Sequence, residues 1–120
     1  MEVPKIFESE YRFCLILWEN EPVNSTRLVE LCKEGVGWSK ATTYTVIRRL
    51  SERGVVKNEN ATVTALISKE EAQKHRLEEM VEETFEGSMP AFIAAFSRSK
   101  RLTRNEVEQL QALIDNFRED

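Results

Sequence analysis

Apolar residues recur at helical spacing in the first third of the chain, and short polar breaks interrupt them. The pattern predicts a helix from an N-cap at Ser9 to about Glu19, with the apolar residues of FCLILW on one face. A second helix is expected to begin at Asn24 or Ser25. It should end at the two glycines of GVG, because glycine readily takes the left-handed conformation that closes a helix. The stretch NEPV separates the two helices.

A third helix is expected to begin at Ser39. Its apolar stripe at i, i+3, i+4 and i+7 consists of Thr43, Val46, Ile47 and Leu50. After Gly54 the spacing changes: two β-prone runs, VVK and TVTALI, flank the polar turn NENA and predict a short hairpin. Three short helices and a hairpin are the layout of a winged helix-turn-helix, in which the third helix enters the major groove of DNA.

The rest of the chain has a helical pattern throughout. A capping box at residues 68–71, in which serine and glutamate satisfy each other's backbone amides, starts a long helix that ends near Gly87. Ser88, with a proline in the first turn, starts a shorter helix, and the polar stretch SRSKR forms a connector. A second capping box at residues 103–106 starts the last helix.

These last helices carry more apolar surface than a winged domain with its own core requires. The apolar residues expected at an interface are Phe85, Phe92, Ile93, Phe96, Leu110, Leu113, Ile114 and Phe117. They either fold back on the winged core or pack against a second copy of the chain, and the second arrangement is favoured. The predicted fold is mainly α with a small β wing: a winged helix-turn-helix domain at residues 1–67 and a helical dimerisation region at residues 68–120.

Charge is distributed unevenly along the sequence. The net charge is −4, yet residues 39–57 hold five basic side chains against one acidic side chain, a local net charge of +4. The five are Lys40, Arg48, Arg49, Arg53 and Lys57. Such a basic segment suits contact with phosphates, although a solvated helix face would look the same. Its place on the third helix of a winged layout favours DNA binding.

Few residues offer other chemistry. Cys14 and Cys32 both lie among apolar neighbours, where a reduced thiol behaves as a small buried hydrophobe. Together with a single histidine, His75, they cannot complete a zinc site without carboxylates, so neither a metal nor another cofactor is expected. An enzyme would need a nucleophile paired with a base, or a glycine-rich loop, and the sequence shows neither, so an enzyme is not expected. No apolar run is long enough to span a membrane, and MEVPKIFESE does not read as an export signal, so a cytoplasmic location is expected.

Several segments, taken in order, resemble the penicillinase and methicillin-resistance repressors, the BlaI/MecI/CopY family. The segments are SEYRFCLILW, WSKATTYTVIRRL followed by ERG, ISKEEA, FEGSMPAFIAAF and LTRNEVEQLQALI. They cover nearly the whole chain. The resemblance implies a transcriptional repressor that binds operator inverted repeats in double-stranded DNA as a homodimer, like the repressors of β-lactamase and penicillin-binding-protein genes in antibiotic resistance.

The resemblance also implies roles for residues of the third helix. Carried over by motif position, the residues that face DNA or position phosphates are Ser39, Lys40, Thr42, Thr45 and Arg49. Tyr44 and Arg48 stand where the family varies, and they are expected to set local specificity.

The chain departs from the family pattern in three places. The wing has Glu59 where the family usually has a basic residue, and Leu66 replaces a tyrosine common in the returning strand. The chain ends in DNFRED and not in the cysteine cluster of the copper-sensing members, which argues against metal sensing.

The resemblance further implies a regulatory protease as a partner. The β-lactam branch of the family is inactivated by cleavage of an Asn–Phe bond in the dimerisation region. The matching bond here is Ala95–Phe96, which keeps the phenylalanine and lacks the asparagine. An alternative function is a winged-helix protein-interaction module without specific DNA binding. The acidic wing and the negative net charge favour that alternative, and the basic third helix opposes it.

Overall fold

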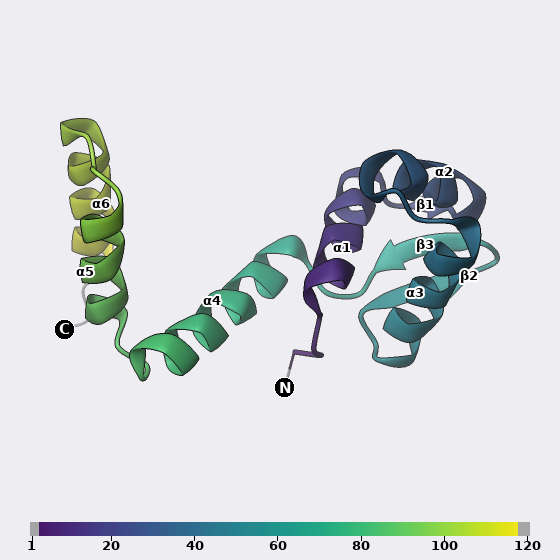
Figure 1. Ribbon diagram of the computed structural model, residues 1–120, viewed down its shortest axis with the longest axis horizontal. Helices are drawn as coiled ribbons and strands as arrows, with labels where there is room; N and C mark the ends of the chain where they lie inside the picture. The colour runs from purple at the N-terminus through teal and green to yellow at the C-terminus, as the bar shows by residue number, and fades with distance from the viewer. Residues whose placement is uncertain (1–2, 118–120) are drawn as a thin grey trace. The chain divides into compact units, whose positions relative to one another are not determined.

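The computed structural model describes residues 3–117 of the 120-residue chain, in two compact units that divide between Leu77 and Glu78 (Figure 1). The elements in chain order are α1 (Glu8–Asn20), β1 (Val23–Asn24), α2 (Ser25–Val36), α3 (Lys40–Glu52), β2 (Val56–Glu59), β3 (Thr62–Ala65), α4 (Lys69–Phe85), α5 (Met89–Ser99) and α6 (Arg104–Asn116). The prediction of a mainly helical fold with a small β wing is confirmed.

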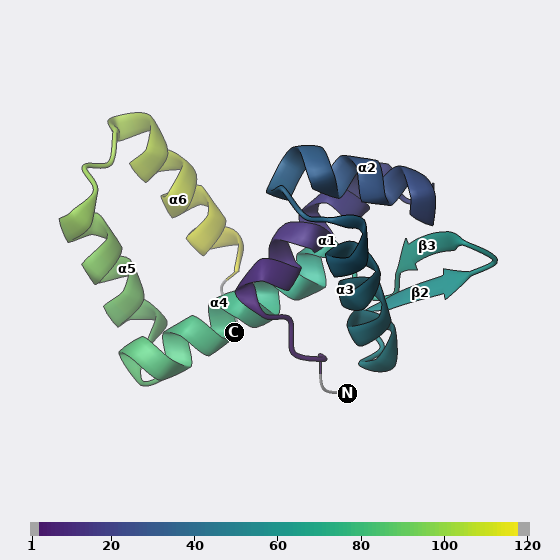
Figure 2. The same cartoon turned by 45° about the vertical axis from the view of Figure 1, so that its right-hand side comes forward.

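The strands of the winged unit form an antiparallel sheet in the order β1-β3-β2. β2 and β3 are the predicted hairpin (Figure 2), and Glu59 lies opposite Thr62 next to the turn. The turn residues Asn60 and Ala61 have positive φ values of 53° and 61°, as in the tight turns that match the twist of paired strands. The sequence pattern does not predict β1, which is two residues long and adds Val23 to the free edge of β3.

The core of the winged unit lies between its three helices and the sheet. Buried side chains of this core include Phe13 and Leu17 from α1, Leu28 and Cys32 from α2, and Val55, Val56 and Val63 from the hairpin. The predicted stripe of α3 is buried at all four positions, Thr43, Val46, Ile47 and Leu50. This burial fixes the rotation of α3 about its own axis, so the opposite face of the helix is turned outward.

The two cysteines belong to this core as free thiols, as predicted. Burial raises the pKa of Cys14 to about 12 and that of Cys32 to about 11, because apolar surroundings disfavour the charged thiolate. Both thiols are therefore protonated at neutral pH, where they are poor nucleophiles.

The ends of the first two helices differ in part from the prediction. Ser9 is not the N-cap of α1: the Phe7 N–H donates to Glu10 Oε1 (2.9 Å), so the helix begins at Glu8. Of the two glycines in GVG, Gly37 ends α2 with a φ of 71°, whereas Gly35 lies inside the helix. A Cβ on Gly35 would approach the Ile16 side chain to 3.0 Å, so this glycine serves close packing against α1.

The other predicted helix starts are observed. The Asn24 side chain accepts a hydrogen bond from the Thr26 N–H (2.8 Å), so Asn24, and not Ser25, is the N-cap of α2. Both predicted capping boxes are formed, at Ser68 with Glu71 and at Thr103 with Glu106.

In the second unit, α5 and α6 carry their apolar stripes largely uncovered. No residue of either helix is buried in the part of the chain that the structure describes. The polar connector is shorter than predicted, because α5 continues to Ser99 and the Lys100 N–H still donates to the Phe96 carbonyl (3.0 Å). Within this unit, the apolar side chains of α5 and α6 therefore stay largely exposed to solvent.

The first turns of α4 belong to the winged unit. Ala72 is 1% exposed, and the compact unit runs to Leu77, ten residues beyond the boundary expected at residue 67. None of the helices among residues 3–117 is long and apolar enough to cross a membrane.

Candidate nucleic-acid interface

The outward face of α3 carries most of the residues predicted to meet DNA. Lys40, Thr42, Arg48 and Arg49 are exposed, and Thr45 is half-buried. The face is therefore a row of hydroxyl and cationic groups above the buried stripe. These are the side-chain types that bind phosphate oxygens and base edges.

Ser39 holds the start of this face in place. Its Oγ accepts a hydrogen bond from the Thr42 N–H (3.2 Å) and donates one to Thr42 Oγ1 (3.1 Å). Thr43, one residue on, donates its hydroxyl to the Ser39 carbonyl (3.1 Å). The exposed hydroxyls of Ser39 and Thr42 thus lie at the N-terminus of α3, where backbone amides and the helix dipole favour a phosphate.

Tyr44 has a structural contact in addition to its predicted role. The side chain is half-buried, and its hydroxyl lies 3.3 Å from Ser25 Oγ at the start of α2. The Ser25 N–H in turn donates to the carbonyl of Ala61 at the tip of the wing (2.8 Å). Tyr44 therefore connects α3, α2 and the wing, an arrangement that the helical spacing of α3 does not reveal.

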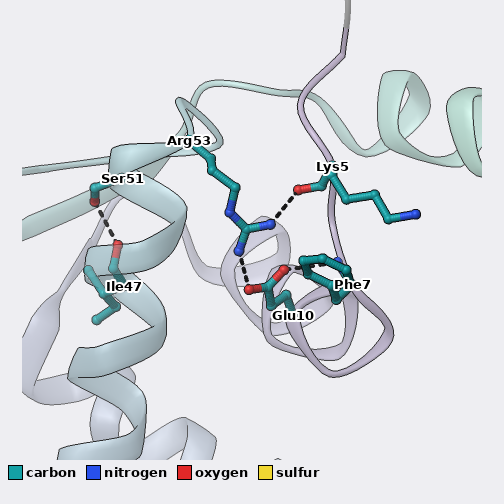
Figure 3. Close-up of polar contacts among 6 residues, drawn as sticks. All are labelled: Lys5, Phe7, Glu10, Ile47, Ser51 and Arg53. Atoms are coloured by element: carbon teal, nitrogen blue, oxygen red, sulfur yellow. Dashed lines mark hydrogen bonds and ion pairs between the residues drawn. The ribbon is translucent and has the colours of Figure 1, made fainter.

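Arg53 is half-buried, points toward α1 and does not belong to the outward face. Its guanidinium pairs with the Glu10 carboxylate and donates to the Lys5 carbonyl (2.7 Å), as Figure 3 shows. The guanidinium carbon also lies 5.2 Å from the centre of the Phe7 ring. The interpretation of all five basic residues as one phosphate-contacting face is therefore wrong for Arg53.

Two further cations of the basic segment have acidic neighbours. Lys57 pairs with Glu59 within the wing (2.6 Å), which neutralises the charge of the wing locally. Arg48 Nε lies 4.0 Å from Glu52, and both side chains are about two-thirds exposed, so this contact is weak and readily exchanged for a phosphate. For Lys40 and Arg49, residues 3–117 provide no ion pair. Within residues 39–57, the cations that stay available to a phosphate are thus Lys40, Arg48 and Arg49.

The residues predicted at the dimer interface lie on α4, α5 and α6 and, for Phe117, at the C-cap of α6. Phe85 and Phe92 are half-buried and meet edge to face, with ring centres 5.8 Å apart, and Phe92 also approaches Phe96. The remaining members are exposed, namely Ile93, Phe96, Leu110, Leu113, Ile114 and Phe117.

The predicted cleavage bond, Ala95–Phe96, lies inside α5. The helix continues beyond it, because the Lys100 N–H donates to the Phe96 carbonyl (3.0 Å). Among residues 3–117, no cluster of three histidine, cysteine, aspartate or glutamate side chains is arranged to hold a metal ion.

Comparison with known proteins identifies the family of this chain. The family model for the penicillinase repressor matches residues 6–116, nearly the whole chain. The chain belongs to the penicillinase repressor family. This penicillinase repressor family member is thus a repressor-type transcriptional regulator, as the sequence motifs indicate, and the family is one of regulators, not of enzymes.

Two curated relatives are similar to it over most of their length. The methicillin resistance regulatory protein MecI of Staphylococcus aureus is 20% identical over 115 residues, which are 92% of this chain and 94% of MecI. A 16.5 kDa protein encoded in the region 3′ of ptsI in Latilactobacillus sakei is 27% identical over 114 residues, 92% of this chain and 78% of that protein.

The internal and the outward cations of this penicillinase repressor family member should differ in their effect on stability. Replacing Arg53 by Met is expected to lower the free energy of unfolding by about 3 kcal/mol, because the buried Glu10 carboxylate loses its partner. Replacing Arg49 by Met should change it by less than about 0.5 kcal/mol, since Arg49 is exposed. Urea denaturation followed by fluorescence of Trp18 and Trp38, both in the winged unit, measures the difference. Equal stabilities of the two variants would contradict the internal role of Arg53.

Proposed function

We propose that this protein represses transcription by binding operator inverted repeats in double-stranded DNA as a homodimer. The observation that carries the proposal is the outward face of α3, where Lys40 and Arg49 stand beside exposed hydroxyls while a buried stripe fixes the rotation of the helix. In this proposal Ser39, Lys40 and Arg49 bind phosphates and position α3. Thr45 and Arg48 reach base edges in the major groove.

The remaining two predicted residues have narrower roles in the proposal. Thr42 offers its hydroxyl to a phosphate at the helix N-terminus, next to Ser39. Tyr44 contributes to local specificity mainly by holding α3 against the start of α2, since its hydroxyl is engaged there.

Homodimerisation is supported by the uncovered apolar side chains of the second unit. Ile114 is 59% exposed and Phe117 is 80% exposed, on helices that contain no buried residue among those described. Packing these faces against a second copy removes them from water in both chains, and a two-fold dimer fits a two-fold operator. The proposed assembly acts in the cytoplasm of a bacterium, where it meets the chromosome, and both curated relatives are bacterial.

A winged-helix protein-interaction module is the second candidate. The observation that favours it is the wing, in which Lys57 and Glu59 neutralise each other and leave little positive charge for a phosphate.

Selection of bound sequences from a random duplex library tests the proposal. The proposed repressor should enrich a sequence with two inverted half-sites, whereas an interaction module should enrich nothing. A bound sequence with a single half-site would retain DNA binding and contradict the dimer.

A further inference from the structure

The start of α4 packs against α1 through a contact between Arg76 and Tyr11 within the winged unit. The Arg76 guanidinium lies 4.1 Å from the centre of the Tyr11 ring, a distance suited to a cation–π interaction. Arg76 also pairs with Glu8, with Nη2 2.8 Å from Oε2. One turn earlier on α4, Gln73 Nε2 lies 3.4 Å from the Tyr11 hydroxyl. Tyr11 thus takes part in two contacts with the same helix.

Further contacts between α1 and the start of α4 lie along α1. Tyr11 meets Trp18 edge to face, with ring centres 5.7 Å apart, and the Trp18 Nε1–H donates to the Ile67 carbonyl (3.0 Å). Between these points Ala72 is buried. The chain is therefore held to α1 at its entry into α4 and again two turns later, which fixes both the position and the direction of the first turns of α4, up to Arg76, within the winged unit.

The direction matters because an α-helix is stiff. The 17 residues of α4 span about 25 Å at a rise of about 1.5 Å per residue. A tilt of about 10° at the start of such a helix would displace its far end by about 4 Å, close to the ~3.4 Å rise of one base pair. A small change in the angle at which α4 leaves the winged unit would therefore displace its far end by a distance comparable with the rise of one base pair.

We propose that Arg76 and Tyr11 clamp α4 onto α1 and thereby determine which spacing between two DNA half-sites the dimer accepts. This inference rests on the proposed function. Arg76 and Tyr11 are positioning residues, which act through α4 and not through contact with DNA. The chemistry of recognition stays with α3, and the clamp adds selectivity for operator geometry.

The test compares the full-length wild type with Arg76→Met, which keeps an apolar stem and removes the guanidinium. The probe is a set of duplexes carrying the half-site enriched by wild-type selection, in inverted pairs at successive spacings. The wild type should prefer one spacing. In Arg76→Met the ratio of affinities between the best and the next spacing should fall about fivefold, as expected from losing one cation–π contact and one exposed ion pair. Affinity for a duplex with a single half-site should stay within about twofold.

Three further variants make the outcome specific. Glu8→Gln removes the ion pair from an exposed side chain and should broaden the spacing preference in the same direction, to a smaller extent. Arg76→Lys keeps a cation near Glu8 and Tyr11 and should retain part of the preference. Arg12→Met, which replaces an exposed arginine on α1, the helix of Glu8 and Tyr11, is the matched control and should leave the spacing profile unchanged.

An Arg76→Met variant with the wild-type spacing profile would overturn the clamp. So would a variant that loses single-site affinity as strongly as paired-site affinity, because Arg76 would then support the fold of the reading unit and not its placement. A wild type that binds no duplex in any selection would instead reject the proposed function, and the clamp with it.

Discussion

Cleavage between Ala95 and Phe96 is expected to convert the proposed dimer into monomers and to lower operator affinity by ~10²–10⁴. The cut separates α6 from the rest of the chain, with the apolar side chains of Leu110, Leu113 and Ile114. Together with Phe117, these contribute a gross stabilisation of roughly 6–12 kcal/mol per chain to an interface, at roughly 1.5–3 kcal/mol each. A monomer that holds one half-site loses the high effective concentration of the second reading unit.

The measurement requires a specific protease site inserted between Ala95 and Phe96. Gel shift and native mass are recorded before and after complete cleavage, and the uncut insertion variant is the control. An intact dimer that remains bound to operator after complete cleavage would exclude this switch. Because the bond lies inside α5, a natural regulatory protease would have to unwind that helix locally before it could cut.

The second large effect is expected at the outward face of α3. Replacing both Arg48 and Arg49 by Ala should weaken operator binding by about 10²–10³-fold, since each lost contact to a phosphate or base edge costs about 1–3 kcal/mol. Arg49→Ala alone should weaken binding to all sequences alike, whereas Arg48→Ala or Thr45→Ala should change the preferred bases. A control with the same change of charge is the double variant Arg12→Ala, Arg104→Ala. Wild-type affinity in the Arg48, Arg49 variant would show that this helix does not bind the operator.

The local pattern of the sequence was sufficient to predict α3 and its outward face. A serine cap, four apolar or β-branched residues at helical spacing and a glycine after the last turn agree with one another, and the structure buries the four predicted residues. Helix starts with a capping box were predictable for the same reason, because both partners lie within four residues of each other. The misplaced start of α1 shows the limit, since Glu10 and not Ser9 reaches the free amide at Phe7.

Contacts between residues far apart in the sequence could not be predicted. Arg53 looked like another cation of the basic segment, and its partner Glu10 stands 43 positions earlier. Arg76 and Glu8 are separated by 68 positions, and each looked like an ordinary surface charge of a helix. A short strand such as β1 has no period of its own to detect. The apolar stripes of α5 and α6 were visible as patterns, but the sequence pattern does not show what covers them, which in the proposed dimer is a second copy of the chain.

The most direct test of DNA binding by α3 is the salt dependence of affinity for random duplex DNA. On random duplex DNA, where Arg48 has no specific base edge to read and contacts a phosphate as Lys40 and Arg49 do, six such contacts in two protomers should give the plot of log affinity against log salt a slope of about −5. The Arg48→Ala, Arg49→Ala variant should retain only the Lys40 contacts, with a slope of about −2. A slope near zero for the wild type, or no binding at low salt, would contradict DNA binding by α3 and favour a protein-interaction module.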